Sequence, residues 1–286
     1  MPGLNSTGAP DTRDYNLGRG ILRAAKLNAA GLPDTDGFRD LGNAPEFNIS
    51  ISIEDLRHQS SRTQLKFTDA RCVISQEVGI SYILDESNFQ NMGDFLAGST
   101  EVYDNPHDTT WLSTAGIVST ATKVGNWYAL QDPNGNRVYN LGAAGVVYEV
   151  VLDPAGAATP LVLGTDFELD VEMGLLRPLP GGAVSDGDTV GWAITTGATV
   201  PVDLDQVNAL TEGSVTLALL FVSTNACDSG QKTEFLFHKV SVSADGDFSL
   251  IGDEITQLPF TGVAQVNSAI PGASKVMRAR TYDQAA

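Results

Sequence analysis

The chain has 286 residues, of which 42% are hydrophobic and 18% charged, and these ordinary globular proportions exclude intrinsic disorder and a collagen-like repeat. Its formal net charge of −18 argues against ordinary nucleic-acid binding, which depends on clustered Lys and Arg that neutralise phosphates. The length is enough for one large all-β unit or two smaller domains, with a core that needs no disulfide or metal.

The first forty residues are rich in Gly, Asp, Asn and Pro, and they predict an arm followed by a short strand over 20–27. Residues 1–16 contain no apolar stretch of the kind that forms a secretion signal. The longest apolar run, 215–222, has the length of a strand and is far too short to cross a bilayer. We therefore expect a soluble protein with no visible export signal and no membrane contact.

A strict alternation of apolar and polar residues follows at 47–54, and this period of two predicts a half-buried β-strand. Its apolar members are Phe47, Ile49, Ile51 and Ile53. A second alternating run covers 65–74, and a third covers 78–84 after a polar break at Gln76 and Glu77. Together these runs predict a long hairpin and a separate third strand.

The two cysteines, Cys72 and Cys227, lie far apart in apolar runs and form no CxxC pair. We interpret both as small buried hydrophobic residues and not as a disulfide or a redox pair. This interpretation is consistent with folding in a reducing cytoplasm.

The hydrophobic period changes directly after residue 84. Ser87 and Gln90 have the spacing of a capping box, and Gly98 is suited to end a helix. The apolar residues on one helical face are Phe89, Met92, Phe95 and Leu96. We predict one short amphipathic helix that packs on a sheet.

The middle of the chain differs in composition from its two ends. Residues 101–204 contain few basic residues, many Asp and Glu, and short strand patterns separated by turn signals, which are typical of a small β-sandwich. We predict an all-β fold with one short flanking helix. In this fold a tube-type sandwich or barrel domain, formed by 1–100 and 205–286, carries an inserted acidic β-domain at 101–204 and ends in a C-terminal arm.

A search for catalytic patterns finds none with the required spacing. His58, His107 and His238 are far apart, and no serine nucleophile elbow, phosphate-binding loop or complete dinucleotide fingerprint is present. We therefore expect no enzymatic activity, no cofactor and no metal site. His238 lies in an apolar strand, where we expect a satisfied core or interface histidine.

Three carboxylates, Asp166, Glu168 and Asp170, alternate along one predicted strand. Such a row could suit glycosidase chemistry or cation binding. We interpret it instead as the solvated face of an acidic domain.

Five stretches, taken in their order along the chain, resemble the tail-tube (major tail) proteins of long-tailed bacteriophages. Residues 18–22 lead into the first strand, 37–47 lead into the first long strand, and 53–58 precede a polar hairpin tip. The predicted helix at 89–96 and the closing segment at 250–262 also fit this family. The inserted segment is absent from the smallest members.

The resemblance implies a virion protein that forms hexameric rings, which stack into a hollow tube around a DNA conduit. It also implies that the hairpin tip, with the N- and C-terminal arms, joins one ring to the next. The tip residues are His58, Gln59, Ser60, Ser61, Arg62 and Thr63. Unpaired strand edges within one copy would be closed by its neighbours in the ring.

The partners implied are further copies of the chain, the tape measure protein, and the tail terminator or distal tail proteins. Phage DNA would pass through the lumen without specific binding, in a tail assembled in the host cytoplasm. One alternative is another tail component, either a tube under a contractile sheath or a tail terminator. A different alternative is a carbohydrate-binding or glycan-hydrolysing β-sandwich, with a site in the insertion that holds Trp111, Trp127 and Trp192.

Overall fold

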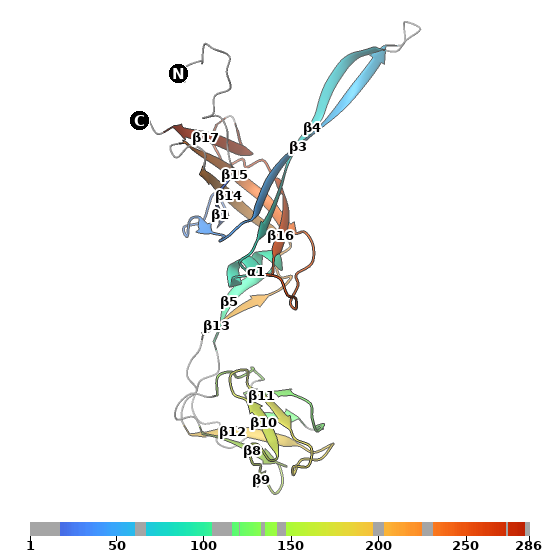
Figure 1. The fold of residues 1–286 in the computed structure, drawn as a ribbon, viewed down its shortest axis with the longest axis vertical. Helices are drawn as coiled ribbons and strands as arrows, with labels where there is room; N and C mark the ends of the chain where they lie inside the picture. The colour runs from blue at the N-terminus through green and yellow to red at the C-terminus, as the bar shows by residue number, and fades with distance from the viewer. Residues whose placement is uncertain are drawn as a thin grey trace. The chain divides into compact units, whose positions relative to one another are not determined.

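A computed structural model describes residues 18–60, 67–104, 116–119, 121–132, 135–141, 147–196, 203–224, 231–272 and 274–283. The chain divides into two compact units, one formed by Met1–Thr100 with Val207–Ala286 and the other by Glu101–Gln206. The expected all-β class with one short helix is confirmed, since antiparallel strands dominate both units (Figure 1). No described helix combines the length and apolarity that crossing a membrane requires.

The first unit contains an eight-stranded antiparallel sheet. Seven strands follow one path, in the order β2 (Arg39–Asp40), β1 (Gly20–Lys26), β14 (Val215–Thr224), β15 (Gln231–Ala244), β16 (Leu258–Ala264), β4 (Phe67–Leu84) and β3 (Glu46–Ser60). The eighth strand, β17 (Met277–Asp283), pairs with β15 off this path. Within the described residues β2 and β3 do not pair with each other, so one chain forms an open sheet and not a closed barrel.

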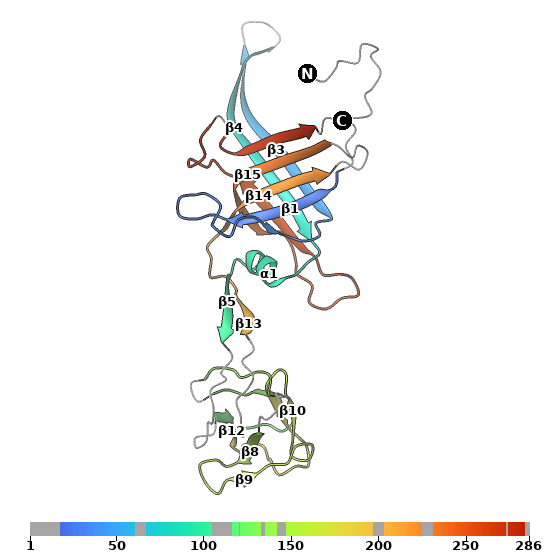
Figure 2. The same ribbon diagram turned by 90° about the vertical axis from the view of Figure 1, so that its left-hand side faces the viewer.

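The core of this unit lies on one face of the sheet. In Figure 2 the helix lies below β1. Tyr82 stacks on Phe260 at a ring distance of 4.7 Å, and Phe95 of the helix meets Phe260 edge-on at 5.5 Å. On β14, Leu217 and Leu219 enter the core while Ala218 is buried on the opposite face. The apolar run at 215–222 is thus covered on both sides, as its composition predicts.

The predicted third strand is not separate. β4 continues through the polar pair Gln76 and Glu77, which stay in register opposite Ile53 and Ser52 of β3. Both residues are exposed in this stretch, so polar side chains cost nothing there and do not mark a turn in the absence of Gly or Pro.

The helix α1 (Phe89–Phe95) begins one residue later than the capping-box pattern predicts. Asn88, and not Ser87, is the N-cap, because its side chain accepts a hydrogen bond from the Asn91 amide at 2.9 Å. At the other end Ala97 takes the left-handed conformation (φ 46°), and the Gly98 amide donates to the Gly93 carbonyl at 2.8 Å. These are the bonds of a Schellman motif, with alanine at the position where glycine is usual.

Leu210 offers a test of backbone strain in this unit. It has φ 59° although 85% of its surface is exposed, so its side chain gains little packing. Because asparagine tolerates the left-handed region better than leucine, we expect Leu210→Asn to raise the free energy of unfolding by about 0.5–1 kcal/mol. Urea denaturation measures this change. Leu210→Ala, which keeps a Cβ at the same φ, should give no such gain.

The second unit consists of two antiparallel sheets that share one core. One sheet has the order β6 (Gly116–Ser119), β12 (Val190–Thr196), β8 (Val147–Leu152) and β9 (Thr159–Pro160), and the other has β10 (Phe167–Asp170), β11 (Leu175–Pro178) and β7 (Tyr128–Ala129). Trp192 is buried between them and donates from Nε1 to the Gln131 carbonyl at 3.0 Å. The chain passes from the first unit to the second within β5 (Ser99–Asp104) and returns within β13 (Asp203–Asn208). These two strands pair as a two-stranded sheet.

The two hydrophobic cores share no residue. We therefore expect that removing Glu101–Gln206 and joining the ends by a short Gly-Ser turn leaves the first unit folded. The thermal midpoint of the truncated protein should match one transition of the full chain in calorimetry. An aggregated product would contradict the independence of the two units.

Candidate assembly surface

The hairpin of β3 and β4 extends beyond the sheet that carries it. β4 pairs with β16 from Val78 to Leu84, and Val78 lies opposite Ala264 at the end of β16. From residue 77 back to 67, the only described strand that pairs with β4 is β3, so the hairpin continues as a two-stranded ribbon (Figures 1 and 2). We call this ribbon, residues 51–60 and 67–77, the β3–β4 arm.

Apolar side chains are exposed at the base of the arm, next to the sheet. Ile51 and Ile53 continue the same face as Phe47 and Ile49, which pack against the core. Yet Ile51 is 67% and Ile53 49% exposed, so the predicted half-buried strand is correct for its first half only. The exposed apolar residues of β4 beside them are Val73 and Ile74.

The interpretation of Cys72 as a buried residue is wrong. Cys72 is exposed on the arm, directly opposite Leu56, which is exposed as well. A two-stranded ribbon has no second layer on either face, so an apolar position in its pattern is not buried within one chain. Cys227 lies outside the described residues.

Side-chain bonds cross-link the two strands of the arm. Asp55 accepts hydrogen bonds from Nε of Arg57 at 3.0 Å and from Nε of Arg71 at 2.5 Å. Arg57 and Arg71 are directly opposite each other, and Asp55 offsets the repulsion expected of two like charges there. His58 Nδ1 lies 2.5 Å from an Asp69 carboxylate oxygen.

The hydrogen bond from Arg57, assisted by Arg71, holds the pKa of Asp55 below its usual value. A lowered pKa means that folding favours the carboxylate. The cluster therefore stabilises the arm at neutral pH and loses this effect as the pH falls below about 4, the ordinary range of Asp. Register shifts at residues 54/55 and 58/59 mark bulges, which increase the twist of the arm.

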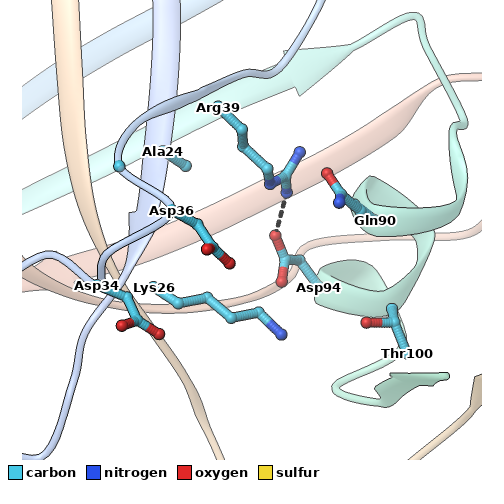
Figure 3. A pocket seen from close by; sticks show the side chains of 9 residues that line it. Ala24, Lys26, Asp34, Asp36, Arg39, Gln90, Asp94 and Thr100 are labelled. Atoms are coloured by element: carbon cyan, nitrogen blue, oxygen red, sulfur yellow. Dashed lines mark hydrogen bonds and ion pairs between the residues drawn. The ribbon is translucent and has the colours of Figure 1, made fainter.

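A cavity of about 440 Å³ lies between the helix and the strand β1. Figure 3 shows Lys26, Asp36 and Arg39 near Asp94, with Arg39 and Asp94 joined as an ion pair. Arg39 also donates from Nη1 to Asn91 Oδ1 at 2.5 Å. Burial raises the pKa of Asp94, and Arg39 opposes that rise.

Asn91 completes this network by donating from Nδ2 to the carbonyls of Leu41 and Glu86, both at 2.9 Å. Arg39 of β2 therefore connects α1 to the segment around β2 through its bonds to Asp94 and Asn91. Among the described residues, no group of three or more His, Cys, Asp and Glu side chains could hold a metal ion.

The carboxylate row of the second unit is engaged in structural bonds. Asp166 is buried and accepts hydrogen bonds from the amides of Val162 and Ala183, which lower its pKa. Glu168 forms an ion pair with Arg177 on the neighbouring strand. The expected solvated face is thus wrong for Asp166, which closes the loop before β10.

A family profile matches residues 15–279, and it is described as a protein of unknown function, UCP028589. The chain belongs to the UCP028589 family. No curated protein matches the chain. The UCP028589 match spans residues of both compact units.

In this UCP028589 protein three of the six predicted tip residues are described, and they fall at the far end of the arm. His58 and Gln59 lie on β3 and Ser60 is its last residue, while Ser61, Arg62 and Thr63 lie outside the described residues. Sequence reasoning missed the ion-pair cluster around Asp55, because it depends on a register with two bulges. It also missed the exposure of Ile51 and Ile53, although the apolar alternation gave a signal for their shared face.

Proposed function

We propose that this UCP028589 protein is a structural subunit whose copies form hexameric rings that stack into the hollow tail tube of a long-tailed phage. The observation that carries the proposal is the group of exposed apolar side chains on the β3–β4 arm, Ile51, Ile53, Val73 and Ile74. Contiguous apolar surface on a folded protein marks a site of association. A structural role of this kind needs no catalytic residue.

The arm has the reach that contact between subunits requires. Its ten residues on β3 span about 30 Å at the usual rise of a strand. The outer edge of β3 has no strand neighbour among the described residues, so its backbone groups can pair with another chain. Such an edge, next to exposed isoleucines, favours association over a solitary state.

Copies of the same chain are the partner that suits an open sheet. A head-to-tail contact repeated by rotation closes a ring, and a projecting arm can continue the assembly along the axis. The number six, and the tape measure, tail terminator and distal tail proteins as neighbours, rest on the tail-tube resemblance. With a net charge of −18, a lumen wall that shares the overall charge would let DNA pass without binding.

A second candidate function rests on one exposed aromatic residue in the inserted unit. Trp127 is exposed, and the guanidinium of Arg177 lies 5.0 Å from its ring centre. Trp192 is buried, and Trp111 lies outside the described residues. If the unit binds glycans, Trp127→Ala should abolish retention on an immobilised-glycan panel that the full chain recognises.

The proposed function is tested by the association of the purified full-length chain. Sedimentation velocity over a range of concentrations should reveal ring-sized species, and negative-stain electron microscopy should show hollow tubes. A chain that stays monomeric under every condition would refute the proposal, provided that the cylinder of the parent particle is assigned to another polypeptide.

A further inference from the structure

The loop between β15 and β16, residues 245–257, carries a second exposed apolar surface, and it projects beside α1 (Figure 1). Leu250, Ile251 and Ile255 are 81%, 96% and 77% exposed. The loop has a defined shape, because Phe248 packs on Phe95 and the Thr256 hydroxyl donates to the Ser249 carbonyl at 3.3 Å. It therefore presents its apolar tip to a partner at little cost in ordering.

The same loop is purely acidic. Its charged residues are Asp245, Asp247, Asp253 and Glu254, and it contains no Lys, Arg or His. A surface that fits this loop must combine apolar walls with positive charge.

A pocket of about 310 Å³ in the same unit has these two properties. Its apolar walls include Pro33, Leu236, Ile270 and Pro271, and its polar members are His238 and Arg278. Within the described part of the chain, no carboxylate lies close enough to Arg278 to form an ion pair, so its charge is available to an acidic partner.

His238 gives an independent sign that the pocket takes a ligand. The side chain is buried with 5% exposed, and its Nε2 has no hydrogen-bond partner among the residues that the structure describes. Buried polar atoms are rarely left unsatisfied, because the loss of hydration costs free energy. Burial and the nearby Arg278 lower the pKa of His238, so the ring is neutral at neutral pH and can donate or accept one bond.

The loop cannot reach the pocket of its own chain. β16 separates them: the loop precedes Leu258, whereas His238 lies past the other end of the strand, since Val240 is paired with Ala264. The seven residues of β16 span about 20 Å. The pocket also opens on the face opposite the core, because Leu236 and His238 alternate with the core residue Phe237.

We propose that the 245–257 loop of one copy docks in the His238–Arg278 pocket of the next copy. This inference rests on the proposed self-assembly and names one contact within it. The loop and the pocket lie at opposite ends and on opposite faces of the sheet. The contact between two copies is therefore head-to-tail, and it can repeat from copy to copy. Ile251 and its neighbours fill the apolar walls, and a loop carboxylate meets Arg278.

A charge-exchange experiment on the full chain tests this contact. Asp253→Lys with Glu254→Lys, and separately Arg278→Glu, should each raise the concentration at which the protein associates by at least tenfold. The three substitutions together should restore association. Glu149→Lys with Glu172→Lys makes the same charge change at exposed positions of the inserted unit and should have no effect. Circular dichroism verifies that each variant is folded.

The outcomes separate this inference from the proposed function. If folded single variants assemble as well as the wild type, or if the combination fails to rescue, the loop–pocket contact is refuted while self-assembly stands. If the wild type itself never associates, both fail. A photo-crosslinking amino acid at position 251 gives a second measurement: crosslinks from one copy to the pocket strands of another support the contact, and crosslinks within one chain or to other surfaces overturn it.

Discussion

Replacing both Ile51 and Ile53 by aspartate is expected to raise the concentration at which the protein associates by at least about 100-fold. Burial of one isoleucine contributes roughly 2 kcal/mol, so losing two at a contact removes about 4 kcal/mol before the cost of burying charge is added. In one chain, Ile51 is 67% and Ile53 49% exposed. The folded subunit should therefore keep its thermal midpoint within a few degrees.

A matched control lies on the opposite face of the same strand. Asn48 and Ser50 are exposed and alternate with the core-facing Phe47 and Ile49. Asn48→Asp with Ser50→Asp adds the same charge without touching the apolar face, and it should leave association close to that of the wild type. Sedimentation velocity compares the two variants. Equal losses in both would show that charge, and not the apolar face, governs association.

Replacing Arg39 by methionine is expected to destabilise the first unit by about 3 kcal/mol at neutral pH, because it leaves the buried Asp94 without its ion-pair partner. Asp94 is only 8% exposed at its side chain, and Arg39 also donates to Asn91. The helix α1 carries both acceptors, so its attachment to the sheet weakens. Urea denaturation, followed by circular dichroism, measures the loss.

The pH dependence of this loss has a definite sign. Burial raises the pKa of Asp94 above its unfolded value and Arg39 opposes the rise, so the variant has the higher native pKa. A carboxyl of raised pKa binds its proton more tightly when folded, and stability is lost as the pH rises through the native pKa. The variant should therefore lie closer to the wild type at pH 5 than at pH 7.5.

The double variant Arg39→Met with Asp94→Leu supplies the control for this network. Replacing both members of a buried ion pair by apolar residues of similar volume is often close to neutral. We expect most of the lost stability to return and the pH dependence of the loss to disappear. A double variant as unstable as Arg39→Met would place the effect in lost packing around Asn91 instead of in the unpaired charge.

Local pattern predicted the first long strand and the helix of this protein correctly. The period of two at 47–54 corresponds to a real strand, and the change of period after residue 84 corresponds to the helix Phe89–Phe95. The acidic middle segment was predicted at 101–204, and the structure has a compact unit over Glu101–Gln206. These features depend on neighbouring residues in the chain, whose side-chain spacing is set by the backbone itself.

The sequence by itself determined which side chains share a face, whereas the tertiary structure decided whether that face is covered. Phe47 and Ile51 belong to one alternation, but only Phe47 lies where the sheet has a core, because β16 stops pairing with β4 at Val78. The exposure of Cys72 and the burial of Asp166 were decided in the same way, by partners distant in sequence. The alternation of a strand fixes the side on which each side chain lies. Whether that side is buried depends on a second layer, which no local pattern specifies.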